Sequence, residues 1–231
     1  MENEYLIETL RQLRHELGAE NVLFVHLVYL PFLGASQDLK TRPAQFSVKD
    51  LRARGIEPDV LVVRAEKPIE TETIHKLSLM TGVEENCVIP STTVKSIYQV
   101  PVNYQSNALG NILLQKLNLP QKPFDMSKWE RLLQHIEEST EIKKIAIIGK
   151  YCALEDAYYS LNEGLKVAGY RNNVKIQLSF INAESLENEE EVHKILGEFD
   201  GIVIPGGFGN RGIQGMMRAA QYAREHKIPY L

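Results

Sequence analysis

A glycine-rich turn, Pro205–Gly209, follows a short apolar run near the carboxyl end of the sequence. Glycine permits left-handed backbone angles and close approach of a ligand, so successive N–H groups around Gly206, Gly207 and Phe208 can converge on a negative charge. Such a turn suits an oxyanion hole or an anion nest. The residue types equally allow a tight connection between a strand and a helix with no chemical role.

A second candidate cluster is the basic segment Asp38–Lys49, in a chain whose net charge is -4. Lys40, Arg42 and Lys49 provide positive charge, and hydroxyl and amide side chains lie between them. Lysine acts as a point charge and arginine as a bidentate fork, a combination that suits a polyphosphate. A solvated charged loop without a ligand is the alternative that the residue types leave open.

The composition narrows the class of protein. With 231 residues and a net charge of -4, the chain lacks the basic excess of a general nucleic-acid or membrane-surface binder. No apolar run is long enough to span a membrane. Cys87 and Cys152 are far apart in sequence and have no histidine at metal-ligand spacing, so we expect neither a disulfide framework nor a metal site. A reducing cytoplasm fits this cysteine usage best.

The elements that must position the two clusters alternate between strands and helices. This alternation predicts an α/β fold with two doubly wound, mainly parallel-sheet domains. In the first half, Val22–Leu30 is an almost unbroken apolar run, which is typical of a strand covered on both faces. Residues 34–45 are expected to form a loop, and Ser47 is expected to cap the helix that follows. The strand pattern restarts at Ile142, after a segment with two prolines.

Several separated motifs, in the same order along the chain, resemble the CTP synthase family. They are Glu2–Gln12, Lys40–Gln45, Ser47–Lys49, Gly55–Asp59, Ser96–Tyr98, Gly149–Tyr151 and Pro205–Gly209. In that family an amidoligase domain uses ATP to phosphorylate the 4-oxygen of UTP, ammonia displaces the phosphate, and a class I glutaminase domain supplies the ammonia. The resemblance implies a P-loop-like amidoligase part over residues 1–118, a linker and connecting helix over 119–141, and a truncated class I glutamine amidotransferase part over 142–231.

The resemblance also assigns binding residues. For UTP, or for CTP as a feedback inhibitor, it implies Glu2, Lys40, Thr41, Arg42, Pro43, Ala44, Gln45 and Lys76. For ATP it implies Thr92, Thr93 and Val94; for glutamine and its oxyanion it implies Gly206, Gly207 and Phe208, with Arg211 as a candidate for a GTP-responsive surface. The family usually reads Lys-Thr-Lys-Pro-Thr-Gln where this chain has Arg42 and Ala44. Arginine changes the geometry and alanine removes a hydroxyl, so we expect an altered nucleotide contact.

Further implications concern the whole protein. They are ATP and Mg²⁺ as requirements, GTP as an allosteric activator, and a cytoplasmic homotetramer that takes UTP, ATP and glutamine. The magnesium carboxylates of the family would precede Met1, and the nucleophilic cysteine would come just after Leu231. We therefore expect no catalytic residue and no metal ligand in this chain, and no activity from it alone. The alternative is a non-catalytic UTP- or CTP-binding regulatory module of the same fold, which the flanking sequence would distinguish. Another class I amidotransferase would explain the glycine turn but not the basic cluster.

Overall fold

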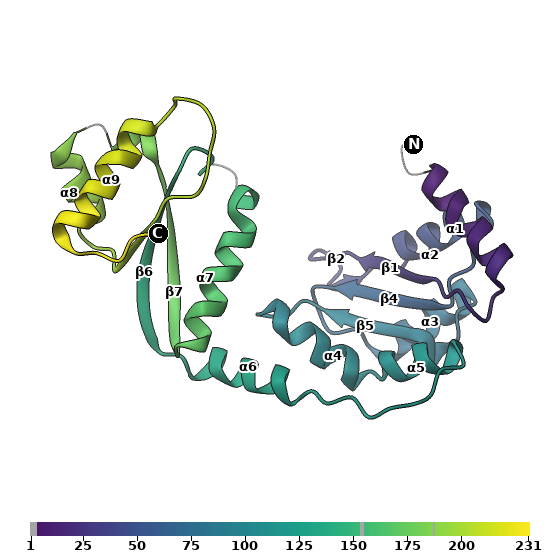
Figure 1. Ribbon diagram of the computed structural model, residues 1–231. Coiled ribbons are helices and arrows are strands. Elements are labelled where there is room, and N and C mark those ends of the chain that lie inside the picture. Colours follow the sequence, from purple (N-terminus) through teal and green to yellow (C-terminus); the bar gives the residue numbers. More distant parts are fainter. Residues whose placement is uncertain (1–3, 153–154, 187) are drawn as a thin grey trace. The chain divides into compact units, whose positions relative to one another are not determined.

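The chain folds into two units, each built on its own parallel sheet. The computed structural model describes residues 4–152, 155–186 and 188–231, and the chain divides into Met1–Glu130 and Arg131–Leu231. Both sheets are parallel and both carry helices (Figure 1). The predicted α/β class with parallel sheets is confirmed.

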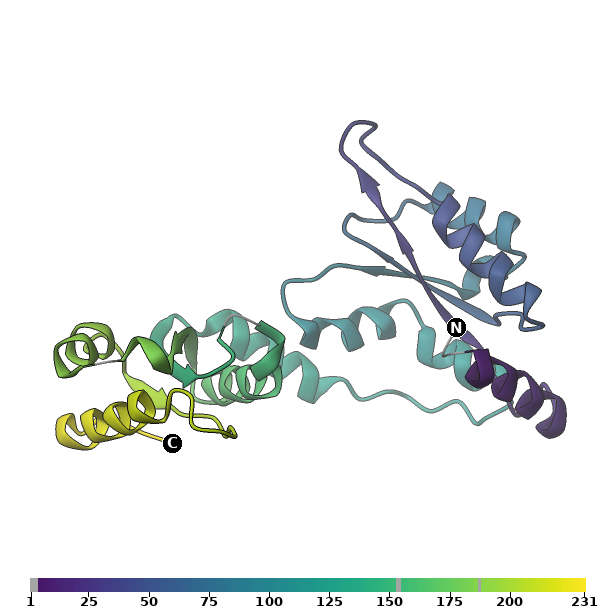
Figure 2. The same cartoon turned by 90° about the horizontal axis from the view of Figure 1, so that it is seen from above.

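The sheet of the first unit contains β1 (Val25–Leu30), β4 (Val60–Ala65) and β5 (Val88–Thr92), in the order β1-β4-β5. Central strand β4 is rich in valine and is buried everywhere except at Arg64, as expected for a strand covered on both faces. Helices α2 (Arg42–Ala53) and α3 (Thr71–Thr81) lie on one face of the sheet, and α4 (Val100–Ser106) and α5 (Leu109–Lys116) lie on the other (Figure 2). The remaining elements are α1 (Glu4–Leu17), β2 (Phe32–Leu33), β3 (Asp38–Leu39), η1 (Glu85–Cys87), η2 (Ile97–Gln99) and α6 (Ser127–Glu138), which continues into the second unit.

Strand β1 is covered on only one face by the described residues. Val25, Leu27 and Tyr29 are 46%, 63% and 44% exposed, whereas Val28 and Leu30 are buried. The prediction of a strand covered on both faces is wrong here, because β1 is the edge of the sheet and α4 packs against β5, two strands away.

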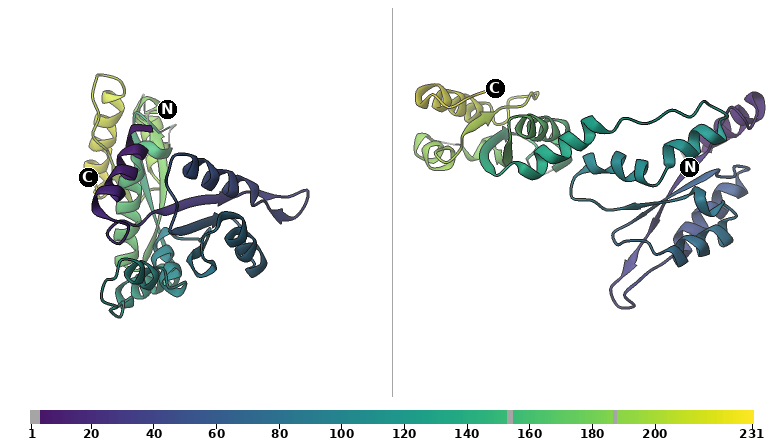
Figure 3. Two further views of the ribbon diagram at one scale, coloured as in Figure 1. Left: turned by 90° about the vertical axis from the view of Figure 1, so that its right-hand side faces the viewer. Right: turned by 90° about the horizontal axis from the view of Figure 1, so that it is seen from below.

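The segment that follows β1 is more ordered than expected. β2 and β3 pair as an antiparallel hairpin that projects beyond the end of β1 (Figure 3), and α2 begins at Arg42. The predicted loop over 34–45 and the predicted cap at Ser47 are therefore wrong. Pro43 explains the earlier start, because its ring fixes a helical φ and its missing N–H costs nothing in a first turn. Ser47 lies inside the helix, with its hydroxyl oxygen 2.9 Å from Nε2 of His26.

The second unit is doubly wound. Its strands are β6 (Glu141–Gly149), β7 (Val174–Asn182) and β8 (Gly201–Val203), in the order β7-β6-β8, so β7 and β8 lie on opposite sides of β6 and the strand order reverses there. Helix α7 (Tyr159–Arg171) covers one face, and α8 (Glu189–Leu196) and α9 (Ile213–His226) cover the other (Figure 1). The short helices η3 (Glu155–Tyr158) and η4 (Ala183–Ser185) complete the unit. Near the last described residue, Tyr230 forms a single parallel bridge with Ile202 of β8.

The core of this unit lies between its sheet and the helices α8 and α9. It includes Ile148, Leu196, Ile202, Ala219 and Ala223, all at most 1% exposed. None of the helices within residues 4–152, 155–186 and 188–231 is both long and apolar enough to cross a bilayer.

Candidate functional site

The glycine turn lies at the carboxyl end of the second sheet. β6 and β8 are neighbouring parallel strands, and the turns after them, Lys150–Cys152 and Ile204–Gly212, lie at the same end of the unit (Figure 1). The strand order reverses between these strands, and such a switch point is the place where open α/β sheets bind ligands.

The turn is open to solvent and rich in free backbone donors. Phe208 is 96% exposed, and a side chain at Gly206 would meet nothing within 4 Å. Gly209 has a φ of +79°, which favours glycine. Within the part of the chain that the structure describes, the N–H groups of Gly206, Gly207 and Phe208 donate to no protein acceptor. They are available to a ligand oxygen, as an oxyanion hole requires.

A buried lysine forms hydrogen bonds with the end of this turn. Lys150 is 8% exposed, and its Nζ donates to the carbonyl oxygens of Phe208, at 2.9 Å, and Gly209, at 2.5 Å. Sequence reasoning assigned Lys150 no role beyond its place in a motif. Its position directly after β6, beside the glycine turn after β8, is the signal that could have identified it.

Arg211 braces the same region. Its Nη2 donates to the carbonyl oxygen of Lys150 at 2.9 Å, and its Nη1 lies 3.7 Å from Oε2 of Glu184. Its guanidinium carbon lies 5.8 Å from the centre of the Tyr151 ring, within the range of a cation–π contact. The side chain predicted for a GTP-responsive surface thus has structural contacts of its own.

Neither thiol has the properties of an activated nucleophile. Cys87 is 1% exposed, and burial raises its pKa above the ordinary thiol value. The Sγ of Cys152 donates to the carbonyl oxygen of Ile181 at 3.2 Å, and burial raises the pKa of this thiol as well. A catalytic cysteine needs a lowered pKa, so the chemistry of the turn does not come from these two residues.

In the first unit, part of the basic segment lines one cavity. This cavity has a volume of about 390 Å³, and the residues around it are Asp38, Leu39, Lys40, Thr41, Arg42 and Lys76. Lys40 donates to Asp38 at 3.0 Å, and this hydrogen bond lowers the pKa of Asp38. The structure thus brings together four of the residues predicted to bind a nucleotide, and three cations and one carboxylate line the same cavity.

The other predicted nucleotide residues lie elsewhere. Ala44 is 1% exposed and packs in the hydrophobic core. Pro43 forms the first turn of α2. Gln45 donates to the Thr41 hydroxyl at 3.1 Å and lines a neighbouring cavity on α2. Glu2 lies outside the described residues.

The three residues predicted to bind ATP follow one another at the end of β5. Thr92 pairs with Ala65 of β4, and the N–H of Thr93 donates to the Ala65 carbonyl at 2.9 Å. Neither threonine nor Val94 lines the Lys40 cavity. They lie at the carboxyl end of a parallel strand, where ligands bind in this class of sheet.

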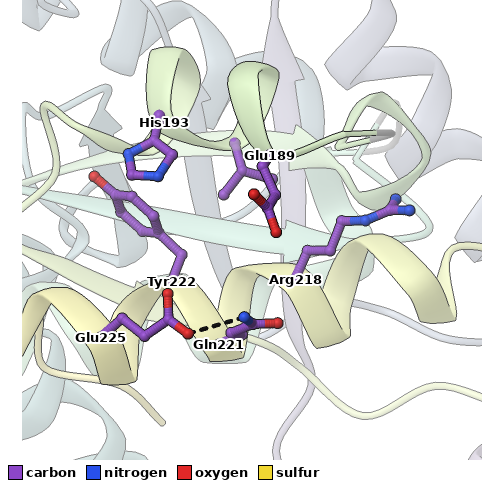
Figure 4. Close-up of a pocket in the computed structure, with 7 residues that line it drawn as sticks. Glu189, His193, Arg218, Gln221, Tyr222 and Glu225 are labelled. Atoms are coloured by element: carbon purple, nitrogen blue, oxygen red, sulfur yellow. Dashed lines mark hydrogen bonds between the residues drawn. The ribbon is translucent and has the colours of Figure 1, made fainter.

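A third cavity lies between α8 and α9 (Figure 4). It measures about 70 Å³, and Gln221 donates across one turn of α9 to Glu225 at 2.8 Å. The ring of His193 packs edge-on against Tyr222, with centroids 4.9 Å apart. None of the residues predicted from the sequence lines this cavity. Across the described parts of the chain, no group of three or more His, Cys, Asp or Glu side chains could hold a metal ion.

Comparisons with known proteins match one family within the first unit and a different family within the second. Residues 1–119 match the family described as CTP synthase N-terminus, and residues 153–231 match the one described as glutamine amidotransferase class-I. A CTP synthase of Lactiplantibacillus plantarum is 44% identical over 225 residues, which cover 97% of this chain and 42% of that relative. One of Dehalococcoides mccartyi is 43% identical over 231 residues, 100% of this chain and 42% of the relative. The chain thus spans less than half the length of these curated relatives.

Among solved structures, the chain is similar to one described as the glutaminase domain of Trypanosoma brucei CTPS with bound acivicin. The sequence identity is 38% and the TM-score is 0.36, over 38% of this chain and 34% of that one.

Proposed function

The chain belongs to the CTP synthase family, and we propose that the protein of which it forms part makes CTP from UTP, ATP and glutamine. The observation that carries the proposal is the convergence of Lys40, Thr41, Arg42 and Lys76 on one cavity, in a chain that also carries the glutamine amidotransferase segment. A cavity with three cations is suited to the triphosphate of UTP or of CTP.

The first unit supplies the nucleotide half of this reaction. The 4-oxygen of UTP is a poor leaving group, so ATP transfers its terminal phosphoryl group to it, ammonia attacks the adjacent carbon, and phosphate leaves with the oxygen. Thr92, Thr93 and Val94 contact ATP in this proposal. Within the described residues, no group of three or more His, Cys, Asp or Glu side chains could hold a metal ion, so we assign the magnesium ligands to none of these residues.

The second unit supplies the ammonia. A cysteine from elsewhere in the protein attacks the side-chain amide of glutamine, and the N–H groups around Gly206, Gly207 and Phe208 receive the oxyanion that develops. Ammonia leaves, and water then releases glutamate from the thioester. The other family properties complete the proposal: GTP as an activator, with Arg211 near its site, and a cytoplasmic homotetramer.

The test uses the whole protein encoded around this chain. CTP formation is measured from UTP and ATP with either glutamine or ammonium chloride, and glutamate release is measured in parallel. Activity with both nitrogen sources is the expected result. Tight binding of CTP without any turnover would favour the regulatory module over the enzyme.

A further inference from the structure

We propose that Lys150 is a positioning residue that fixes the oxyanion loop, defined here as Gly206–Gly209. The inference rests on the proposed glutaminase role of the second unit. Nothing in the sequence or in the comparisons gives this lysine a function, yet its contacts are unusual for a lysine.

The first observation concerns the groups to which the Lys150 ammonium donates hydrogen bonds. Lys150 is 8% exposed, and within the described residues it forms no ion pair with a carboxylate. Its two protein acceptors are the carbonyl oxygens of Phe208 and Gly209. Because a buried ammonium is costly unless its donors are satisfied, these two carbonyls are held firmly toward Lys150.

The second observation is that these hydrogen bonds attach the oxyanion loop at a second point. At one end, the N–H of Ile204 donates to the Leu231 carbonyl at 2.9 Å and ties the chain to its neighbour. At the other end the anchor is Lys150, which leaves only residues 205–207 between the two attachments. Glycines at 206 and 207 would otherwise sample many backbone angles, so the second anchor limits where their N–H groups can point.

The aliphatic part of the Lys150 side chain also lies next to the oxyanion loop. A side-chain carbon at Gly207 would lie 3.7 Å from Cδ and 3.7 Å from Cε of Lys150, so the stem lies on the side of the loop toward which a side chain at this glycine would point. The stem therefore lies beside Gly207, and the ammonium donates to the carbonyls of the two residues that follow it.

Lys150 is itself held by the body of the unit. The hydroxyl of Tyr158 accepts hydrogen bonds from the N–H groups of Lys150, at 3.2 Å, and Tyr151, at 3.4 Å. Tyr158 is 8% exposed and stacks on Phe180, with ring centroids 6.4 Å apart. Gly149 is required here, because a side chain at that position would collide with the Tyr158 hydroxyl. The loop is therefore connected to the core through Tyr158 and Lys150.

The first test measures the loop in this 231-residue chain and needs no activity. Backbone ¹⁵N relaxation is compared for the wild type, Lys150→Met and Lys144→Met. Methionine at 150 retains a stem but no donors. Lys144 is a matched control on β6, the strand that precedes Lys150, and its ammonium pairs with Glu198 on the surface. We expect lower order parameters for Gly206–Gly209 in Lys150→Met alone. Unchanged order parameters, or global unfolding of the variant, would overturn the inference, since unfolding would make Lys150 a general structural residue.

The second test measures catalysis in the whole protein. Glutamine hydrolysis is normalised to ammonia-dependent CTP formation, which reports the amount of active amidoligase. Removing one oxyanion donor costs about 100- to 1000-fold in kcat, so we expect a loss of about 10- to 100-fold when only its support is removed. The KM for glutamine should change less than about threefold, because the support acts on the transition state. Lys150→Arg retains several N–H donors and should recover part of the rate.

The outcomes separate the two levels of the proposal. A wild-type protein that hydrolyses no glutamine would contradict the proposed function. An active wild type with an equally active Lys150→Met, or a variant whose loss lies entirely in KM, would contradict the inference about Lys150 and leave the function intact.

Discussion

At the scale of single residues, the two departures from the family pattern lie in different environments. Arg42 lines the basic cavity, so its longer, forked side chain can change how a phosphate is bound. Ala44 is 1% exposed within the core, on the buried side of α2. A threonine hydroxyl at this position would enter an apolar environment. The alanine therefore affects packing of the core and not a contact with the nucleotide.

Replacing Lys76 should weaken binding of CTP. Lys76 lies on α3 and brings a cation to the cavity from a different element than Lys40. Losing one charge-assisted contact to phosphate costs about 1.5–3 kcal/mol, so we expect the Kd of Lys76→Met to rise at least about tenfold in calorimetric titration. Lys49→Met is the matched control, because Lys49 lies outside this cavity. Equal losses in both variants would argue against a specific site.

His26 should make the first unit less stable in mild acid. Burial lowers its pKa in the folded chain, so the unfolded chain binds the proton more readily. The neutral form stabilises the fold above the unfolded value of about 6.5, and this contribution is lost as pH falls through the lower folded value. Urea unfolding of the wild type and His26→Gln at pH 7 and pH 5 tests this. The wild type should lose more stability than the variant, and equal losses would contradict the assignment.

At the scale of elements, two helical glycines of the second unit should respond to alanine in opposite directions. A side chain at Gly215 would collide with the carbonyl oxygen of Ala183, which belongs to the backbone of η4. A side chain at Gly164, an exposed position of α7, would meet nothing within 4 Å. Gly215→Ala should lower the free energy of unfolding by about 2 kcal/mol or more, and Gly164→Ala should raise it by about 0.5–1 kcal/mol. Urea denaturation followed by circular dichroism measures both, and stabilisation by Gly215→Ala would show that α9 can move away from η4.

The elements also show how far the sequence alone could lead. The apolar run Val22–Leu30 and the run that starts at Ile142 predict strands in both sheets, because the strands of parallel sheets are rich in apolar residues. The open face of β1 was not predictable from its composition, since exposure depends on which helix packs where. Helix α2 begins earlier than the sequence predicts, because Pro43 favours its first turn and Ser47, which resembles a cap, lies inside it. Lys150 was missed because its partners are 58 and 59 positions away.

At the scale of the whole molecule, the units carry complementary parts of one proposed reaction. The first brings cations together from a hairpin and two helices. The second exposes backbone donors at a sheet edge and supports them with a buried lysine. The chain covers 42% of the length of its curated relatives, and in the proposed reaction each of its units contributes binding groups.

The 231-residue chain alone should hydrolyse no glutamine and form no CTP. Amide hydrolysis at the oxyanion loop needs an activated thiol. Cys87 is buried, the Cys152 thiol donates to a carbonyl, and burial raises the pKa of both. Incubating the chain with glutamine, UTP and ATP should release glutamate no faster than a buffer blank, whereas the whole protein should release it readily. A Cys87→Ser/Cys152→Ser double variant is the control for residual activity: glutamate release that disappears in this variant would place a working nucleophile within the chain and overturn the assignment of the nucleophile to the rest of the protein.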